Sequence, residues 1–170
     1  MASTRPIIDA ICERLQQDIP DAMVDVYPDN PQEYNFIHPS GTILVGYRSS
    51  RFSDEIGLGR ISQQRVMTLA LTIIGANLHG DYGALAILDE ARLSVVGFRP
   101  PDCTPCHLIS EQFVDEEAGA WVYELLLQTE TQQVERLKRQ DLSKLVAVRL
   151  RREGEPLEPD LKPAAQSAKK

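Results

Sequence analysis

Two long segments in which apolar and polar residues alternate constrain the fold more than any other feature of the chain. In residues 61–78 and 120–131 this alternation places large apolar side chains on one face of each predicted strand: Met67, Leu69, Leu71 and Ile73 in the first, and Trp121, Tyr123, Leu125 and Leu127 in the second. A strand patterned in this way buries one face only. We therefore predict a sheet that other elements cover on one side.

Two further segments have the spacing of amphipathic helices. The first can be capped by Ser3 or Thr4 and stops at Pro20, and its apolar residues are Ile7, Ile8, Ile11, Leu15 and Ile19. The second can be capped by Asp81 and ends at Gly97, which suits a left-handed C-terminal position. Its apolar positions are Ala84, Leu85, Leu88, Ala91 and Val95. Both helices are expected to cover the same face of the sheet.

Shorter strands are predicted at 22–27, 42–48 and 107–114, and the acidic turn 115–119 would join the last of these to the strand that follows it. The order of elements is then α-β-β-β-α-β-β. The predicted fold class is α+β: a four- to five-stranded, largely antiparallel sheet with two helices on one face, followed by a basic C-terminal extension. The opposite face is only half polar, which suggests burial in an oligomer, and its apolar members are Val66, Ala70, Ile74, Val122 and Leu126.

Charge divides the 170-residue chain into two parts. Residues 1–135 hold 8 basic and 20 acidic side chains, a net charge of −12, and we assign them to one domain. Residues 136–170 hold 10 basic and 5 acidic side chains, a net charge of +5, with a further strand predicted at 145–150 and a disordered tail after it. The basic extension could bind phosphate, a sheath or shell protein, or the acidic domain itself. Nucleic-acid binding through 136–152 is less favoured, because that segment has no interleaved aromatic residues.

The N-terminus has no signal-peptide pattern, and no apolar run approaches the roughly 20 residues that span a bilayer. We therefore expect a cytoplasmic protein whose three cysteines are free thiols. Cys103, Cys106 and His107 form a C-x-x-C-H motif, the pattern of c-type haem attachment. A small redox or metal-binding protein built on these three residues is the alternative function. No nucleophile with a spaced base, phosphate loop or dinucleotide fingerprint accompanies the motif, so we expect neither an enzyme nor a cofactor.

Arginines gather around a polar segment, 49–60, that is predicted to be a long loop between two strands. Arg and aromatic side chains are enriched at protein interfaces. The segment and its flanks are therefore the candidate interface with another subunit or with a tail protein, and the residues concerned are Arg48, Arg51, Phe52, Arg60 and Arg65. No metal-binding set is predicted.

Several local motifs in this order resemble the Mu-type phage tail terminator family: Tyr27-Pro-Asp-Asn-Pro-Gln-Glu-Tyr34, His38-Pro-Ser-Gly41, Ile43-Leu-Val-Gly-Tyr-Arg48, and Gly97-Phe-Arg-Pro-Pro101 with a following Cys. The resemblance covers roughly residues 5–135. That family is similar in fold to the lambda tail terminator, a small α+β protein that forms a hexameric ring on the end of the tail tube. Relatives also cap phage-derived contractile injection particles.

The resemblance implies a structural subunit that is cytoplasmic until it joins the particle. Its partners would be other copies of itself in a hexameric ring, the tail tube and sheath proteins, and a head connector, with no small-molecule substrate and no membrane. The basic extension departs from the family pattern. We interpret it as an assembly arm that adds a strand to a neighbour through Leu145, Val146, Val148 and Leu150.

Overall fold

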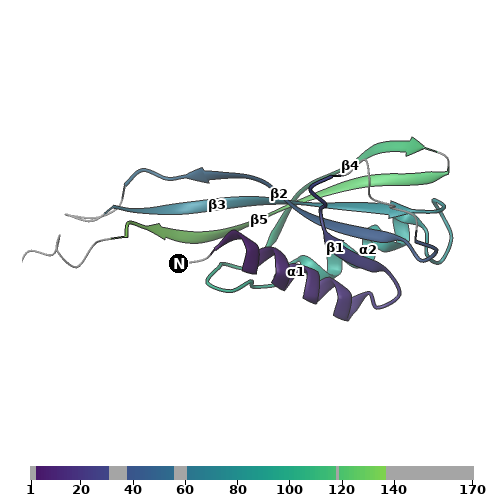
Figure 1. The fold of residues 1–170 in the computed structure, drawn as a ribbon, viewed down its shortest axis with the longest axis horizontal. Coiled ribbons are helices and arrows are strands. Elements are labelled where there is room, and N and C mark those ends of the chain that lie inside the picture. The colour runs from purple at the N-terminus through teal and green to yellow at the C-terminus, as the bar shows by residue number, and fades with distance from the viewer. Residues whose placement is uncertain (1–2, 31–37, 56–60, 118, 137–170) are drawn as a thin grey trace, which may run out of the picture. The chain divides into compact units, whose positions relative to one another are not determined.

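A computed structural model of the chain describes residues 3–30, 38–55, 61–117 and 119–136. The predicted α+β class and order of elements are confirmed (Figure 1). The helices are α1 (Thr4–Asp18) and α2 (Ala84–Val95), and the strands are β1 (Met23–Val26), β2 (Thr42–Phe52), β3 (Ser62–Gly75), β4 (His107–Glu117) and β5 (Ala120–Val134). In the described part of the chain, no helix is long and apolar enough to cross a membrane.

The five strands form one sheet in the order β1-β2-β3-β5-β4. All neighbouring strands are antiparallel except β1 and β2, which pair in parallel from Met23 opposite Thr42 to Val26 opposite Val45. A parallel pair needs a connection that carries the chain back to the starting end of the sheet. The segment between β1 and β2 is long enough for this, so the sheet is mixed, with antiparallel pairs in the majority.

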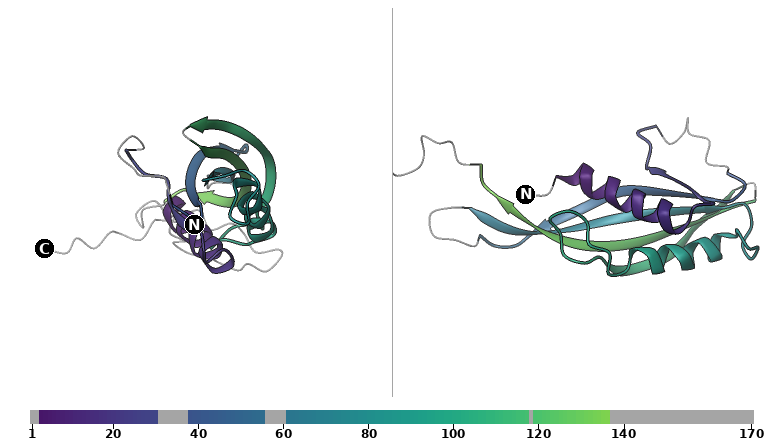
Figure 2. Two further views of the ribbon diagram at one scale, coloured as in Figure 1. Left: turned by 90° about the vertical axis from the view of Figure 1, so that its right-hand side faces the viewer. Right: turned by 90° about the horizontal axis from the view of Figure 1, so that it is seen from below.

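The core lies between the two helices and one face of the sheet. Both helices pack on the same face, side by side in the view from below (Figure 2). The apolar side chains predicted to line that face on β3 are all fully buried, as are Leu125 on β5 and Leu127. They contact helix residues spaced three or four positions apart, namely Ile7, Ile11 and Leu15 of α1 and Ile87, Leu88 and Ala91 of α2. The alternation and the helical spacing thus identified the core.

Strand β2 is longer than its sequence pattern indicates. The segment 49–52, predicted as the start of a loop, continues the strand and pairs with β3, from Ser49 opposite Thr68 to Phe52 opposite Arg65. A register shift between Tyr47 and Ser49 interrupts the alternation. Because three of these four residues are polar and the register is shifted, nothing in their pattern distinguishes the strand from a loop.

Strand β4 also extends further than predicted, through the acidic residues that were expected to form a turn. Asp115 pairs with Val122, and Glu116 pairs with Trp121. The reversal of the chain falls at Gly119, whose φ of +85° lies in the left-handed region that favours glycine. The sequence pattern therefore predicted this hairpin correctly but placed its turn too early in the chain.

The start of α2 differs from the prediction in its cap. Gly83, and not Asp81, occupies the N-cap position, and it makes no side-chain cap bond. Asn77 supports this helix start instead, since its carbonyl oxygen accepts a hydrogen bond of 2.8 Å from the Ala84 N–H and its Oδ1 accepts one of 2.6 Å from Gly80. The predicted left-handed end is confirmed at Gly97, with φ of +76°.

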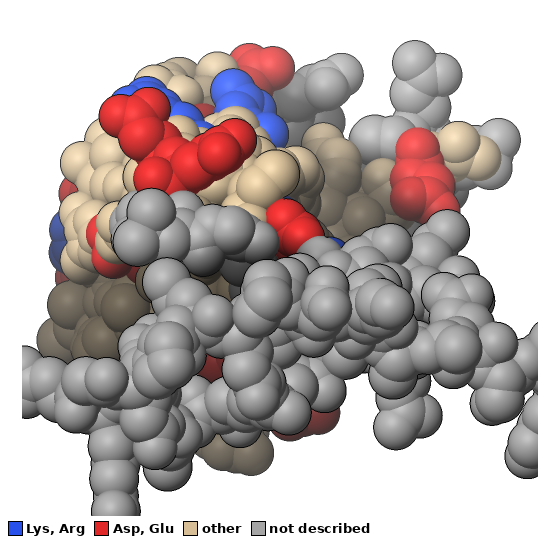
Figure 3. All heavy atoms as spheres, turned by 90° about the vertical axis from the view of Figure 1, so that its left-hand side faces the viewer, with Lys and Arg blue, Asp and Glu red and all other residues tan. Residues whose placement is uncertain are grey.

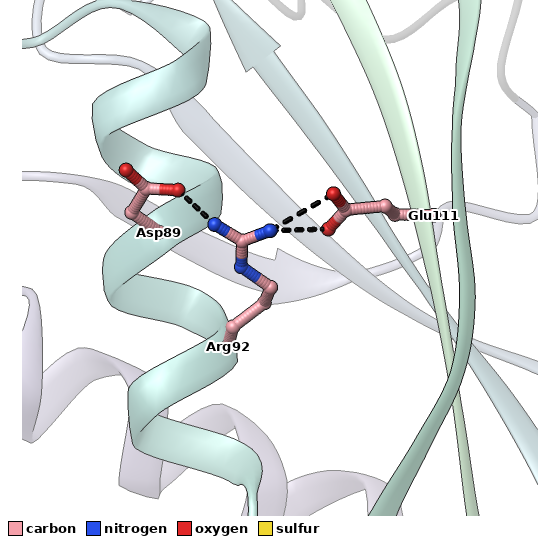
Figure 4. A network of polar contacts seen from close by, with 3 residues as sticks. All are labelled: Asp89, Arg92 and Glu111. Carbon is pink, nitrogen blue, oxygen red and sulfur yellow. Dashed lines mark hydrogen bonds and ion pairs between the residues drawn. The ribbon is translucent and has the colours of Figure 1, made fainter.

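An ion pair joins α2 to the edge strand β4 (Figure 4). Arg92 Nη1 donates to both carboxylate oxygens of Glu111, at 2.8 and 2.9 Å, and Arg92 also pairs with Asp89 one turn back.

We expect Arg92→Ala to lower the free energy of unfolding by about 1 kcal/mol, the upper end for partly exposed pairs with good geometry. Urea unfolding measures this. Arg5→Ala, which removes a within-helix pair with Asp9, is the control and should cost about 0.3 kcal/mol. Equal losses of stability in the two variants would show that the ion pair between α2 and β4 contributes no more than a pair within one helix.

One buried hydroxyl lacks a partner among the described residues. Ser94 is 5% exposed, and its Oγ makes no hydrogen bond. A buried, unsatisfied polar group costs roughly 1–3 kcal/mol. Ser94→Ala should therefore raise the free energy of unfolding by about 1 kcal/mol, measured as an upward shift of the urea midpoint at unchanged m-value. A lower midpoint would mean that the hydroxyl contributes a contact that the structure does not show.

Candidate assembly surfaces and the cysteine loop

The predicted interface arginines differ in exposure: Arg48 and Arg51 are exposed, whereas Arg65 is half-buried. Arg51 and Phe52 are exposed on the last part of β2, and Phe52 retains 53% of its accessible surface. Arg48 lies at the register shift and pairs with Glu124 of β5 at 3.5 Å. Seen from the end of the sheet where β2 passes into β3, basic side chains lie directly beside carboxylates (Figure 3). Arg60 lies outside the described residues.

Arg65 is held within the fold. Its Nη2 donates to Thr4 Oγ1 and its Nε donates to Ser50 Oγ, both at 2.9 Å, and the guanidinium lies 6.0 Å from the centre of the Tyr47 ring. These contacts tie the start of α1 to β2 and β3. Because Nε and Nη2 form one edge of the guanidinium and both donate within the fold, Arg65 positions α1 against the sheet.

The sheet face away from the helices has the half-apolar character that the sequence predicted. Strand register places Ala70 opposite Leu126 and Ile74 opposite Val122, and Ala70 and Ile74 are already buried in the single chain. A groove of about 540 Å³ runs over this part of the sheet. Its lining includes Tyr27, Tyr47, Arg48, Thr72, Val114, Val122 and Glu124. Glu124 is fixed there, since Gln112 Nε2 also donates to it at 3.0 Å.

Exposed apolar side chains on β4 were not singled out by the sequence pattern. Ile109, Phe113 and Val114 are 46%, 51% and 52% exposed on this edge strand. Register shifts fall at Ile109 and at Val114, so two bulged positions break the alternation. The available signal was compositional: four large apolar residues in a strand whose other residues are acidic or polar.

The C-x-x-C segment is a structural loop that is bound to β5. Thr104 is joined to Glu130 by two hydrogen bonds, from its N–H to the Glu130 carbonyl at 2.8 Å and from the Glu130 N–H to its Oγ1 at 3.0 Å. Thr129 Oγ1 donates to the Thr104 carbonyl at 2.6 Å, and Thr131 Oγ1 donates to the Asp102 carbonyl at 2.8 Å. The loop therefore continues the sheet where β4 has not yet begun.

Both thiols of this loop are buried, whereas the neighbouring imidazole is exposed on the first residue of β4. Burial raises the pKa of Cys103, and burial followed by the neighbouring Cys103 raises the pKa of Cys106 to about 11. A thiol must be deprotonated to act as a nucleophile or metal ligand. Within the described ranges no group of three or more His, Cys, Asp or Glu side chains could hold a metal ion. The geometry thus favours packing over redox or metal chemistry for Cys103, Cys106 and His107.

The rate of alkylation measures directly how reactive the Cys106 thiol is in the folded protein. With a pKa near 11 in place of 9.0, Cys106 holds about 100-fold less thiolate at pH 8 than it does in the unfolded chain. We expect iodoacetamide to modify Cys106 at least about 100-fold more slowly in the native protein than in urea, as followed by peptide mass spectrometry. Comparable rates in the two states would revive the redox alternative.

A family model described as Gp37 protein matches residues 11–152. No match is found among curated protein sequences. A chain in the solved structure "Virion of native gene transfer agent (GTA) particle" has a similar fold, with a TM-score of 0.50 and 13% sequence identity. The similarity covers 78% of the present chain and 98% of that chain. Since the family match spans most of the sequence, the chain belongs to the Gp37 protein family.

Proposed function

We propose that the protein is a structural subunit of a phage-type particle, and more narrowly a tail terminator that forms a hexameric ring on the tail tube. The similarity to nearly the whole length of a chain from a gene transfer agent virion is the observation that carries the proposal. The Gp37 family match and the tail-terminator motifs in the sequence support it. A purely structural role, without catalysis, is part of the proposal, as are residence in the cytoplasm before assembly and attachment to a contractile tail or injection particle.

The described surfaces fit assembly into a ring. A closed ring of identical subunits joined head to tail needs two unlike surfaces that complement each other. The end of β2 presents Arg51 and Phe52, whereas the β4–β5 hairpin presents Asp115 and Glu116, and all four are exposed. An exposed arginine on one copy attracts exposed carboxylates on the next, which favours head-to-tail contact over pairing of like surfaces.

Mass measurement of the purified full-length protein tests the proposal. Light scattering at tens of micromolar, with and without added tail tube protein, should show a ring of about six copies in at least one condition. A protein that stays monomeric in both conditions would count decisively against the terminator assignment.

Charge reversal tests the β2 surface. Arg51→Glu combined with Phe52→Ala should lower the yield of rings by about tenfold, since it replaces an attractive charge and removes an apolar contact at the centre of the proposed interface. Arg99→Glu, at another exposed arginine, is the matched control and should leave the yield unchanged. Equal losses in both variants would place the contact elsewhere.

A further inference from the structure

The outer edge of the sheet at β4 has several features of a strand acceptor. In the described part of the sheet β4 is the last strand, so it pairs with β5 on one side only. An open edge presents backbone N–H and C=O groups to any chain that can pair with them. The exposed side chains of Ile109, Phe113 and Val114 add apolar surface along the same strand.

The charge of β4 restricts what can pair with it. Residues 107–117 contain four acidic and no Lys or Arg side chains, a net charge of −4. Two β4 strands from different copies would therefore repel each other, and the two register shifts also oppose indiscriminate edge pairing. The acidic charge of β4 therefore opposes pairing with a second β4 strand and favours pairing with a basic strand.

The chain itself contains such a strand outside the described residues. Residues 144–152 read Lys-Leu-Val-Ala-Val-Arg-Leu-Arg-Arg, with four basic and no acidic side chains, a net charge of +4. Its apolar residues include Val146 and Val148, which are β-branched and therefore of a type enriched in strands. Charge and composition are therefore the complement of β4.

We infer that residues 145–150 of one copy add as a strand to the open edge of β4 in a neighbouring copy. The inference rests on the proposed function, because it needs copies that sit side by side, and it names the contact that links them. Strand addition gains affinity from backbone hydrogen bonds and specificity from alternate side chains.

For a contact at Phe113, the distance that the chain must span favours a neighbouring copy over the same copy. Phe113 pairs with Tyr123, eleven residues before Val134, so it lies about 36 Å from the end of β5 at 3.3 Å per residue. Val148 of the same copy would need the fourteen residue steps after Val134 to be largely extended, whereas a relaxed chain of that length spans about 20 Å. Chain entropy opposes this stretch. A neighbour placed beside the β4 edge meets no such limit.

Cross-linking between two kinds of full-length copy tests the inference. One copy carries Phe113→Cys, the other carries Val148→Cys, and the two are co-expressed with different tags and treated with oxidised glutathione. A disulfide forms as two thiols are oxidised and the glutathione disulfide is reduced to two thiols. The native cysteines react little, because Cys103 and Cys106 are buried and the pKa of Cys12 is raised to about 11, mainly by its own burial.

We expect peptides containing positions 113 and 148 to be joined between differently tagged copies, at least about tenfold more than with the control acceptor Tyr82→Cys. Tyr82 is also 51% exposed, but it lies near the start of α2 and away from β4. Equal yields with both acceptors would overturn the inference. So would a link that forms only within one copy of a Phe113→Cys, Val148→Cys double variant.

Two further measurements separate this inference from the proposed function. Arg149→Glu combined with Arg151→Glu should lower the cross-link yield about tenfold, whereas Lys169→Glu combined with Lys170→Glu should leave it unchanged; equal effects would overturn the inference. Light scattering on the same samples reports ring formation independently. Rings without the cross-link would overturn strand addition and leave the terminator proposal standing, whereas the absence of rings even with tube protein would overturn the terminator proposal itself.

Discussion

Gly75→Ala is expected to lower the free energy of unfolding by about 3 kcal/mol, the upper end of the cost of overpacking a core. A methyl group at this position would lie 2.5 Å from the Ala84 backbone nitrogen and 2.8 Å from its Cα. Neither β3 nor the start of α2 can easily move away from an added methyl group. Gly75 is paired with Trp121 at the end of β3, and the Ala84 N–H is bound to Asn77 at the start of α2.

Urea unfolding followed by far-UV circular dichroism measures the loss, and Gly97→Ala is its control. Gly97 has a φ of +76° and no atom within 4 Å of an added Cβ, so alanine there meets backbone strain of about 1 kcal/mol and no clash. The comparison isolates the close approach of α2 to β3. A Gly75→Ala variant that loses no more stability than Gly97→Ala would show that the helix start can shift to accommodate the methyl group.

Thr129→Val is expected to lower the free energy of unfolding by about 1.5 kcal/mol, the upper end of the net contribution of an intramolecular hydrogen bond. Thr129 is fully buried, and its hydroxyl is the donor that holds the Thr104 carbonyl at 2.6 Å. Valine has nearly the same shape but no donor, so the Thr104 carbonyl loses this hydrogen bond. The loop that carries Cys103 and Cys106 should then detach more often from β5.

Two measurements follow from that change. Urea unfolding reports the stability, and the rate of iodoacetamide modification at Cys106 should rise about tenfold, because local opening exposes the thiol. Thr68→Val is the control: its hydroxyl accepts a bond from Gln128 on the partly exposed face, and its loss should cost under about 0.5 kcal/mol. If the thiol rate stays unchanged while stability falls, Thr129 supports the core and not the loop.

Periodic segments were predictable because burial itself imposes the period. Leu69 and Leu71 of β3 and the helix residues that cover them share one core, and their spacing indicated both the elements and the face. Ser49 to Phe52 could not be assigned in this way. Their strand exists because β3 lies beside them, and this pairing leaves no periodic pattern in four residues of which three are polar.

The candidate site was predictable only in part for the same reason. Composition drew attention to the arginines around β2, but composition does not report that Thr4 and Ser50 surround Arg65 once the chain has folded. The cysteine motif was equally ambiguous until the loop was seen bound to Thr129 and Thr131. The proposed role of residues 145–150 remains a prediction from their pattern, because they lie outside the described part of the chain.

The pairing of β3 with β5 has a consequence for how the domain folds. Each residue of β3 pairs with one that lies between 46 residues further along, at Gly75 and Trp121, and 72 residues further along, at Ser62 and Val134. Such contacts require large loops to close before they contribute any stability, which slows folding. The central ladder cannot form until the end of β5 has been synthesised, so the nascent chain must keep its apolar strands from aggregating until almost the whole domain is available.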